Sequence, residues 1–181
     1  MASIFDWWLK KSRRLRSALL GPFAKGLVKL GVKANHVTAL SLACGAAAAF
    51  FLFRDRTIFI TLIVLHLVFD ALDGVVARAD RKNKDGEFID YMSDRLVTLI
   101  LLSAAFLNLW NQIIIAAIVL KLVHHLIFVF SRFRTPVLYS RTFFALFYVF
   151  GFYNLGALFV VVTNALGIIL QVHHLVFLRL R

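Results

Sequence analysis

Four aspartates occur in two close pairs: Asp70 with Asp73, and Asp90 with Asp94. Each pair lies at the end of an apolar stretch, and its spacing of three or four places both carboxylates on one face of an expected helix. Carboxylates at the edge of a membrane segment are costly and usually mark a functional site. Oxygen ligands without cysteine or histidine suit a hard divalent cation such as Mg²⁺, Mn²⁺ or Ca²⁺. The pattern therefore predicts a metal site that holds a phosphate-bearing substrate.

The residues between the two aspartate pairs would suit a pyrophosphate beside a bound cation. Gly74 has no Cβ and lets a flat or bulky group approach its helix, and Ala77 lies on nearly the same face. Arg78 offers a fixed, forked positive charge that matches phosphate. Gly86 begins the next helix, where free N–H groups favour an anion. In such a site a carboxylate would deprotonate an attacking hydroxyl while a cation stabilises the transferred group.

Each of these residues also has a simpler explanation when it is taken alone. Gly74 and Ala77 could serve close helix packing, as small residues do in membranes. Arg78 could extend to the membrane surface, and the first aspartate pair could form ion pairs with Arg78 and Arg95. The joint pattern favours the metal site, because so many fixed residue types at set spacing rarely arise together by chance.

The composition places the chain among integral membrane proteins. Of its 181 residues 61% are hydrophobic and 17% are charged, and the mean hydropathy is +0.85, which is far from the usual soluble balance. The single cysteine, Cys44, excludes an intrachain disulfide and a thiolate metal cluster. The net charge is +12, but the basic residues flank apolar segments rather than forming one soluble face. Nucleic-acid binding is therefore not expected.

Six apolar segments must position the aspartates. We expect them to be helices, because a continuous apolar run in lipid has to satisfy its own backbone hydrogen bonds. A spanning helix needs about 17 to 25 residues. The expected spans cover residues 36–53, 57–79, 86–108, 112–131, 142–153 and 155–178. The predicted fold class is an all-α integral membrane protein with six transmembrane helices.

A basic, amphipathic segment, residues 1–33, precedes the spans. Its two adjacent tryptophans and its lysines and arginines suit a juxtamembrane helix at the headgroup level. The dipeptide Gly21-Pro22 is expected to break this helix. The chain thus divides into an interfacial segment, 1–33, and one membrane domain, 34–181, without a soluble domain.

Lysine and arginine are concentrated in the leading segment, after the second and fourth expected spans, and at the C-terminus. The positive-inside rule places these parts of the chain in the cytoplasm. Both termini and the aspartate ends of the second and third spans are then cytoplasmic. Arg54 and Arg56 are a mild exception to this rule, because they lie in the first intervening loop, which is expected on the other side of the membrane. The expected location is a prokaryotic cell membrane.

The stretch from Asp70 to Asp94 resembles the signature of the CDP-alcohol phosphotransferase family, D-x2-D-G-x2-A-R-x(7 or 8)-G-x3-D-x3-D, and matches every fixed position. The six-span layout and the amphipathic leader are also similar to that family, and closest in look to its phosphatidylinositol-phosphate and phosphatidylglycerophosphate synthase branches. The resemblance implies a phospholipid-synthesising enzyme that cleaves the pyrophosphate of a CDP-linked lipid. Such an enzyme releases CMP and joins the phosphatidyl group to an alcohol. A homodimer is implied by the same resemblance.

The resemblance also implies roles for individual residues. Two divalent ions, Mg²⁺ or Mn²⁺, would be held by the aspartates, namely Asp70, Asp73, Asp90 and Asp94. Asp94 would in addition be the catalytic base. The CDP-linked lipid would contact Asn35, His36, Val37, Thr38, Gly74, Ala77, Arg78, Asn83 and Gly86. The first four belong to a segment in which Ala34 replaces the usual proline of the family, and Thr38 could instead be a simple N-terminal turn residue.

The second half of the chain should decide which acceptor is used. No acidic residue follows Asp94, so the cations there suit a phosphorylated acceptor. By the family resemblance this acceptor would contact four basic residues: Arg132, Arg134, Arg141 and Lys121. The positive-inside rule alone would also explain the arginines.

Two histidines within the spans are further candidates. His66 lies one turn before Asp70 and could neighbour the metal site, and His124 could face a polar cavity. The adjacent pairs 124–125 and 173–174 are poorly suited to chelating one metal, because neighbouring side chains on a helix point about 100° apart.

The predicted function is metal-dependent transfer of a phosphatidyl-type group from CDP-diacylglycerol or CDP-archaeol to a small polar acceptor. Glycerol 3-phosphate and inositol phosphate are the favoured acceptors. Alternatives within the family are serine as acceptor, or CDP-choline or CDP-ethanolamine as donor to a lipid alcohol. An alternative of another class is a divalent-cation channel or transporter, although an arginine beside a cation path would be counterproductive.

Overall fold

The computed structural model describes residues 4–79, 86–131 and 140–179. Within these ranges all regular secondary structure is α-helical, and there is no strand. The helices are α1 (Ile4–Lys29), α2 (Ala34–Phe51), α3 (Arg56–Ala79), α4 (Gly86–Leu109), α5 (Gln112–Ser131), α6 (Ser140–Val149) and α7 (Tyr153–Arg179). The predicted all-α fold is confirmed for this part of the chain.

Among the residues that the structure describes, four helices are long and apolar enough to cross a membrane. They are α2, α3, α5 and α7, and their bounds lie within a few residues of the predicted spans. In α4 the apolar segment found within the described residues is Arg95–Leu109. The helix α6 has 10 residues, which at 1.5 Å per residue gives about 15 Å, roughly half of the hydrocarbon core. The count of six spans therefore stays a prediction.

The N-terminal helix does not break where the sequence predicted. Pro22 lies inside α1, which runs continuously from Ile4 to Lys29, so the expected break at Gly21-Pro22 is wrong. Proline removes one backbone donor from a helix interior, and packing against neighbouring helices can offset that loss. Ala24 is fully buried in a small apolar cluster with Val75 and Val76 of α3, so α1 is fixed to the end of α3. The division into domains 1–33 and 34–181 remains a prediction.

The bundle is built from two helix pairs joined through α4. The helices α2 and α3 pack on each other, as do α5 and α7, while α4 contacts α2, α3, α5 and α6. The main apolar core lies among these helices and includes Phe59, Leu101, Tyr148 and Val160. Phe144 and Tyr148 pack with their ring centroids 4.2 Å apart. This core holds the helices that carry the aspartates.

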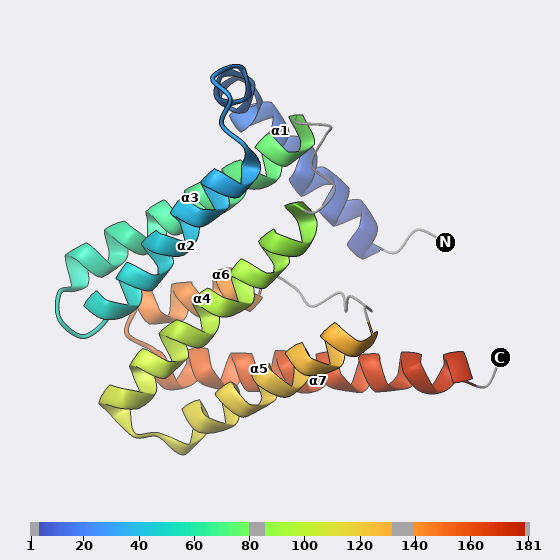
Figure 1. Ribbon diagram of the computed structural model, residues 1–181. Helices are drawn as coiled ribbons and strands as arrows, with labels where there is room; N and C mark the ends of the chain where they lie inside the picture. The colour runs from blue at the N-terminus through green and yellow to red at the C-terminus, as the bar shows by residue number, and fades with distance from the viewer. Residues whose placement is uncertain (1–3, 80–85, 132–139, 180–181) are drawn as a thin grey trace.

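From α2 to α7 successive helices alternate in direction (Figure 1), so this part of the molecule has two distinct ends. Figure 1 shows the starts of α1 and α4 and the ends of α3, α5 and α7 on one side. The turns between α2 and α3, between α4 and α5, and between α6 and α7 lie on the other side. Which side faces the cytoplasm stays a prediction.

Candidate active site

The first aspartate pair lies near the end of α3. Asp73 is buried, with 2% of its surface exposed, and Asp70 is partly buried one turn earlier. Leu72, Val75 and Val76, which lie around Asp73 in the sequence, belong to the apolar cluster shared with α1 and α2. That packing fixes the last turns of α3, and with them the direction in which the buried carboxylate is held.

Gly74 and Arg78 are brought together on the last turn of α3. A Cβ atom built on Gly74 would lie 3.5 Å from Nη1 of Arg78, so the guanidinium folds back along the helix beside the glycine. Arg78 is exposed and Ala77 is partly buried. The arrangement leaves a positive fork next to a position without a side chain, which suits an approaching phosphate.

The second aspartate pair lies in the first turns of α4, which begins at Gly86 as predicted and contacts α3. The backbone therefore brings the helix ends that carry the two pairs to the same side of the molecule (Figure 1). The side chains of Asp90 and Asp94 and the whole of Asn83 lie outside the described residues. The convergence of four carboxylates accordingly stays a prediction.

The predicted nucleotide-binding segment forms the first turn of α2. Val37 and Thr38 are buried, whereas Asn35 and His36 are exposed. Thr38 Oγ1 donates to the carbonyl of Ala34 at 3.1 Å, and the backbone N–H of Lys33 donates to Nδ1 of His36 at 3.5 Å. His36 thus caps the start of α2, whereas the hydroxyl of Thr38 only returns to the carbonyl one turn earlier in the same helix. The nucleotide contact of this segment stays a prediction.

A polar cluster lies inside the second half of the bundle. Lys121 and His124 of α5, Asn164 of α7 and Arg95 of α4 are all buried, with 2–7% of their surfaces exposed. Nδ1 of His124 lies 2.8 Å from Oδ1 of Asn164. The Asn164 amide is in turn fixed by its donation to the carbonyl of Val160 at 2.7 Å, so Nδ1 is the donor of the pair.

The positively charged residues of this cluster are close enough together to interact electrostatically. Arg95 and Lys121 are both close enough to His124 for their positive charges to influence it, and the Arg95 guanidinium lies 5.3 Å from the ring centroid of Phe128. Among the described residues, this part of α4, α5 and α7 contains cations and amides and no carboxylate. The arrangement is suited to hold an anion.

Lys121 and His124 were candidates from the sequence alone, whereas Asn164 was not, and Arg95 was a candidate only as an ion-pair partner of the first aspartate pair. Asn164 could have been noticed from its spacing, because Asn164, Gly167 and Gln171 share one face of an apolar helix. Of the other predicted acceptor residues, Arg132 and Arg134 lie outside the described residues. Arg141 belongs to the first turn of α6, but its side chain is likewise outside them.

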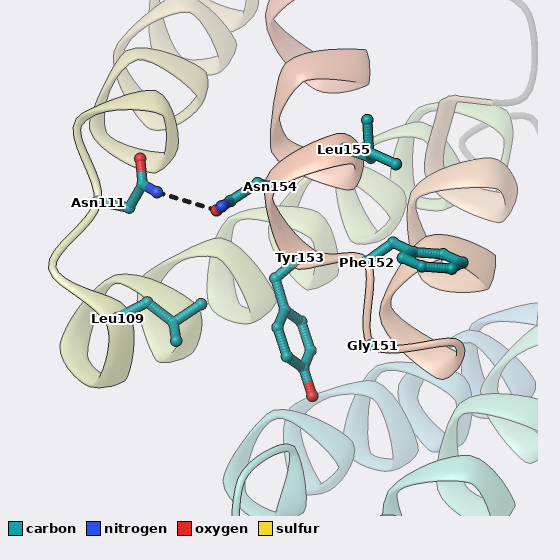
Figure 2. Close-up of a pocket in the computed structure, with 7 residues that line it drawn as sticks. All are labelled: Leu109, Asn111, Gly151, Phe152, Tyr153, Asn154 and Leu155. Atoms are coloured by element: carbon teal, nitrogen blue, oxygen red, sulfur yellow. Dashed lines mark hydrogen bonds between the residues drawn. The ribbon is translucent and has the colours of Figure 1, made fainter.

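A pocket of about 420 Å³ lies at the other end of the molecule, between the α4–α5 and α6–α7 turns. Figure 2 shows Asn111 donating to Asn154 across it at 2.9 Å. The lining residues are Leu109, Asn111, Gly151, Phe152, Tyr153, Asn154 and Leu155. None of these is charged, and both aspartate pairs are at the opposite end, so this pocket is not a candidate for the predicted chemistry.

The described residues contain no group of three or more histidine, cysteine, aspartate or glutamate side chains that could hold a metal. Only Asp70 and Asp73 of the predicted ligand set have described side chains. These two do fit a hard cation, because they supply carboxylate oxygens from one helix face and one of them is buried.

Comparison with known proteins gives one match. The sequence profile of the CDP-alcohol phosphatidyltransferase family matches residues 32–177, which is most of the chain and includes α2 to α6 and nearly all of α7. No curated protein and no solved structure matches the chain.

Proposed function

This chain belongs to the CDP-alcohol phosphatidyltransferase family, and we propose that it transfers a phosphatidyl-type group from CDP-diacylglycerol or CDP-archaeol to a small polar acceptor. The family is one of phosphotransferases in phospholipid biosynthesis. The observation that carries the proposal is the buried Asp73 on the last turns of α3, at the side of the molecule where α4 begins. A buried carboxylate in a membrane helix is costly and calls for a function.

The donor would be held at the ends of α2, α3 and α4. Gly74 and Arg78, which lie side by side on α3, support a role in holding the pyrophosphate. The first turn of α2, residues 35–38, would contact the cytidine, and Ala77, Asn83 and Gly86 would complete the contact with the donor. Its lipid chains would stay in the membrane beside the exposed apolar surface of the bundle.

Asp70, Asp73, Asp90 and Asp94 would hold two divalent ions, Mg²⁺ or Mn²⁺. These ions would neutralise the pyrophosphate and stabilise the charge that develops on it. The carboxylates themselves would fix the position of the donor between α3 and α4.

Asp94 would act as the general base. It would take the proton from the acceptor hydroxyl as that oxygen forms a bond to the β-phosphorus, which is the phosphorus attached to the lipid alcohol. The bond between this phosphorus and the bridging oxygen breaks, and CMP leaves with the electron pair. The backbone of α4 supports this assignment, since Asp94 lies about one helical turn beyond Asp90.

The acceptor would be phosphorylated, with glycerol 3-phosphate and inositol phosphate as the favoured candidates. Support comes from the buried cations Arg95 and Lys121, which influence His124 inside α4, α5 and α7. Charge-assisted hydrogen bonds from lysine and arginine are a common way for proteins to bind a phosphate group. Arg132, Arg134 and Arg141 would guide the acceptor to this place. Serine offers one carboxylate beside its own positively charged ammonium group, so it matches these cations less well than a phosphate does. An arginine beside a cation path would repel the permeating ion, which argues against a channel.

We further propose a homodimer in a prokaryotic cell membrane, with both termini and the active site facing the cytoplasm. The charge pattern supports the orientation, because the basic segments lie on the side of the aspartates. That side is where a water-soluble acceptor would reach a donor held in the membrane.

The function is tested by CMP release from radiolabelled CDP-diacylglycerol with purified full-length protein. Glycerol 3-phosphate, inositol 1-phosphate and serine are supplied in turn, with Mg²⁺ or with excess EDTA. We expect release with one phosphorylated acceptor, and loss of release in EDTA. Full activity in EDTA would contradict the metal proposal, and release with serine alone would contradict the phosphorylated acceptor.

A further inference from the structure

A buried histidine and a serine tie α3 to α2 just below the first aspartate pair. Nδ1 of His66 lies 2.9 Å from both Oγ and the carbonyl oxygen of Ser41. Ser41 Oγ in turn donates to the carbonyl of His66 at 3.0 Å. Because the serine hydrogen is directed to that carbonyl, Nδ1–H is the donor to the Ser41 carbonyl. His66 is 1% exposed and Ser41 is 2% exposed, so water does not compete for these bonds.

A glycine brings α4 to the same place. Gly45 is one turn after Ser41 on α2, and a Cβ atom built on it would lie 2.7 and 2.8 Å from the two Cγ atoms of Val97. It would also lie 3.3 Å from Nδ1 of His66. Small residues allow this close approach of helix backbones in membranes. We call Ser41, Gly45, His66 and Val97 the three-helix junction.

The three-helix junction lies one turn from the predicted site on each of its helices. Thr38 is three residues before Ser41, Asp70 is four residues after His66, and Asp94 is three residues before Val97. A turn of helix contains 3.6 residues. All three steps lead toward the side where α3 ends and α4 begins (Figure 1).

Directional hydrogen bonds fix the relative height of two helices, whereas apolar contacts between them allow small sliding movements. A polar group in an apolar bundle is costly unless it is hydrogen-bonded, so the paired state of Ser41 and His66 is strongly favoured over shifted ones. Val97 is β-branched and stiff, so its contact with Gly45 defines how closely α4 approaches.

We propose that Ser41, Gly45 and His66 are positioning residues that set the heights of α2, α3 and α4 relative to one another. They thereby set the spacing between Thr38, Asp70 and Asp94 without touching the substrate. The inference rests on the proposed function, because the proposed function places the metal ions and the donor in one common site at these three helix ends.

The test uses the full-length protein in detergent with three single variants. Ser41→Ala removes one hydroxyl and Gly45→Ala pushes α4 away from α2. The matched control is Ile63→Ala. Ile63 is buried on α3 one turn before His66, and therefore lies farther from the aspartates than His66 does. The measurements are Tm, Mn²⁺ binding by electron paramagnetic resonance, and the Kd of CDP-diacylglycerol in the presence of Mn²⁺.

We expect Ser41→Ala and Gly45→Ala to weaken both Mn²⁺ and CDP-diacylglycerol binding about tenfold, since small misplacements of positioned groups are costly. Ile63→Ala should lower Tm at least as much, because it leaves a cavity, yet keep both affinities within about twofold of the wild type. Adding Val97→Ala to Gly45→Ala removes the two Cγ atoms that the new methyl group meets, and should restore both affinities.

Wild-type affinities in Ser41→Ala and Gly45→Ala would overturn the proposal. So would affinities that simply follow Tm in all variants, Ile63→Ala included. Ser41→Ala decides the question by itself if Gly45→Ala does not fold. Failure of the proposed function looks different, because then the wild-type protein itself binds no CDP-diacylglycerol.

Discussion

Asp94 carries the chemical step in the proposed reaction, and its removal can be separated from substrate binding. Asp94→Asn keeps the shape and the oxygen of the side chain but cannot accept the hydroxyl proton. We expect turnover to fall by about 100-fold or more, the usual contribution of a general base. The Kd of CDP-diacylglycerol should rise far less than turnover falls, because asparagine keeps one oxygen ligand for the ion. CMP release and equilibrium binding of the labelled donor measure the two effects.

A matched control is Asp55→Asn at the other end of the molecule. Asp55 is exposed, and its Oδ1 accepts the N–H of Ile58 at the start of α3, a role that asparagine also fulfils. This variant should have wild-type turnover. Wild-type turnover in Asp94→Asn as well would remove the base assignment.

Lys121 offers a test of the acceptor site. Lys121→Met keeps an unbranched chain of similar length in a buried position while removing the charge. We expect the KM for a phosphorylated acceptor to rise about tenfold or more, because hydrogen bonds to charged groups are strong, with the KM for CDP-diacylglycerol unchanged. Lys25→Met, on the exposed surface of α1, should change neither value. Equal effects on both substrates would argue for a structural role of Lys121 instead.

The aspartate pairs could be recognised in the sequence because their spacing is local and repeats along two helices, and their role as metal ligands stays a prediction. The sequence was not sufficient for Asn164, whose meaning depends on His124, 40 positions away. The residues next to a single amide in an apolar helix do not indicate which residue of another helix will be its hydrogen-bond partner. Contacts of this kind follow from the packing of α5 on α7, which the sequence leaves undetermined.

At the scale of the helices, the pairing of α5 with α7 depends on Gly167. A Cβ atom there would lie 2.5 Å from Cε1 and 2.7 Å from Nε2 of His124. Gly167→Ala should therefore destabilise the protein by about 1–3 kcal/mol through overpacking, although alanine normally favours a helix. Thermal unfolding in detergent measures the change. The control is Gly26→Ala on α1, where no atom lies within 4 Å of the new methyl group, and equal stability of the two variants would contradict the prediction.

The helix boundaries could be predicted where an apolar run ends at charged or turn-forming residues. The start of α4 at Gly86 and the whole extent of α5 agree with the prediction. The break at Gly21-Pro22 was wrong because local propensity was outweighed by the packing of α1 on α3. The helix α6 is shorter than a span, with Gly151 in a left-handed conformation (φ 79°) in the turn after it.

For the whole molecule, the two ends should differ in their access to water-soluble reagents. The test replaces Cys44 by alanine and introduces either Lys33→Cys or Arg54→Cys, which are exposed positions at opposite ends of α2. A membrane-impermeant maleimide should label Arg54→Cys in intact cells and Lys33→Cys only in inverted vesicles. Labelling in the reverse order would place the aspartates outside the cell. The position of Arg54 makes this a direct test of the residue that disagrees with the positive-inside rule.

The attachment of α1 to α3 has a consequence for how the enzyme would meet its lipid. One face of α1 is buried on α3 through Ala24, while Leu15, Leu19 and Phe23 are more than half exposed at a spacing of four residues. Such an apolar stripe is suited to insert at the boundary between the headgroups and the acyl chains of a bilayer. A helix resting there and fixed to α3 would hold Asp70 and Asp73 at a constant depth below the membrane surface. The diphosphate of a lipid already lies near that depth, so the donor would reach the carboxylates by lateral diffusion, without leaving its leaflet.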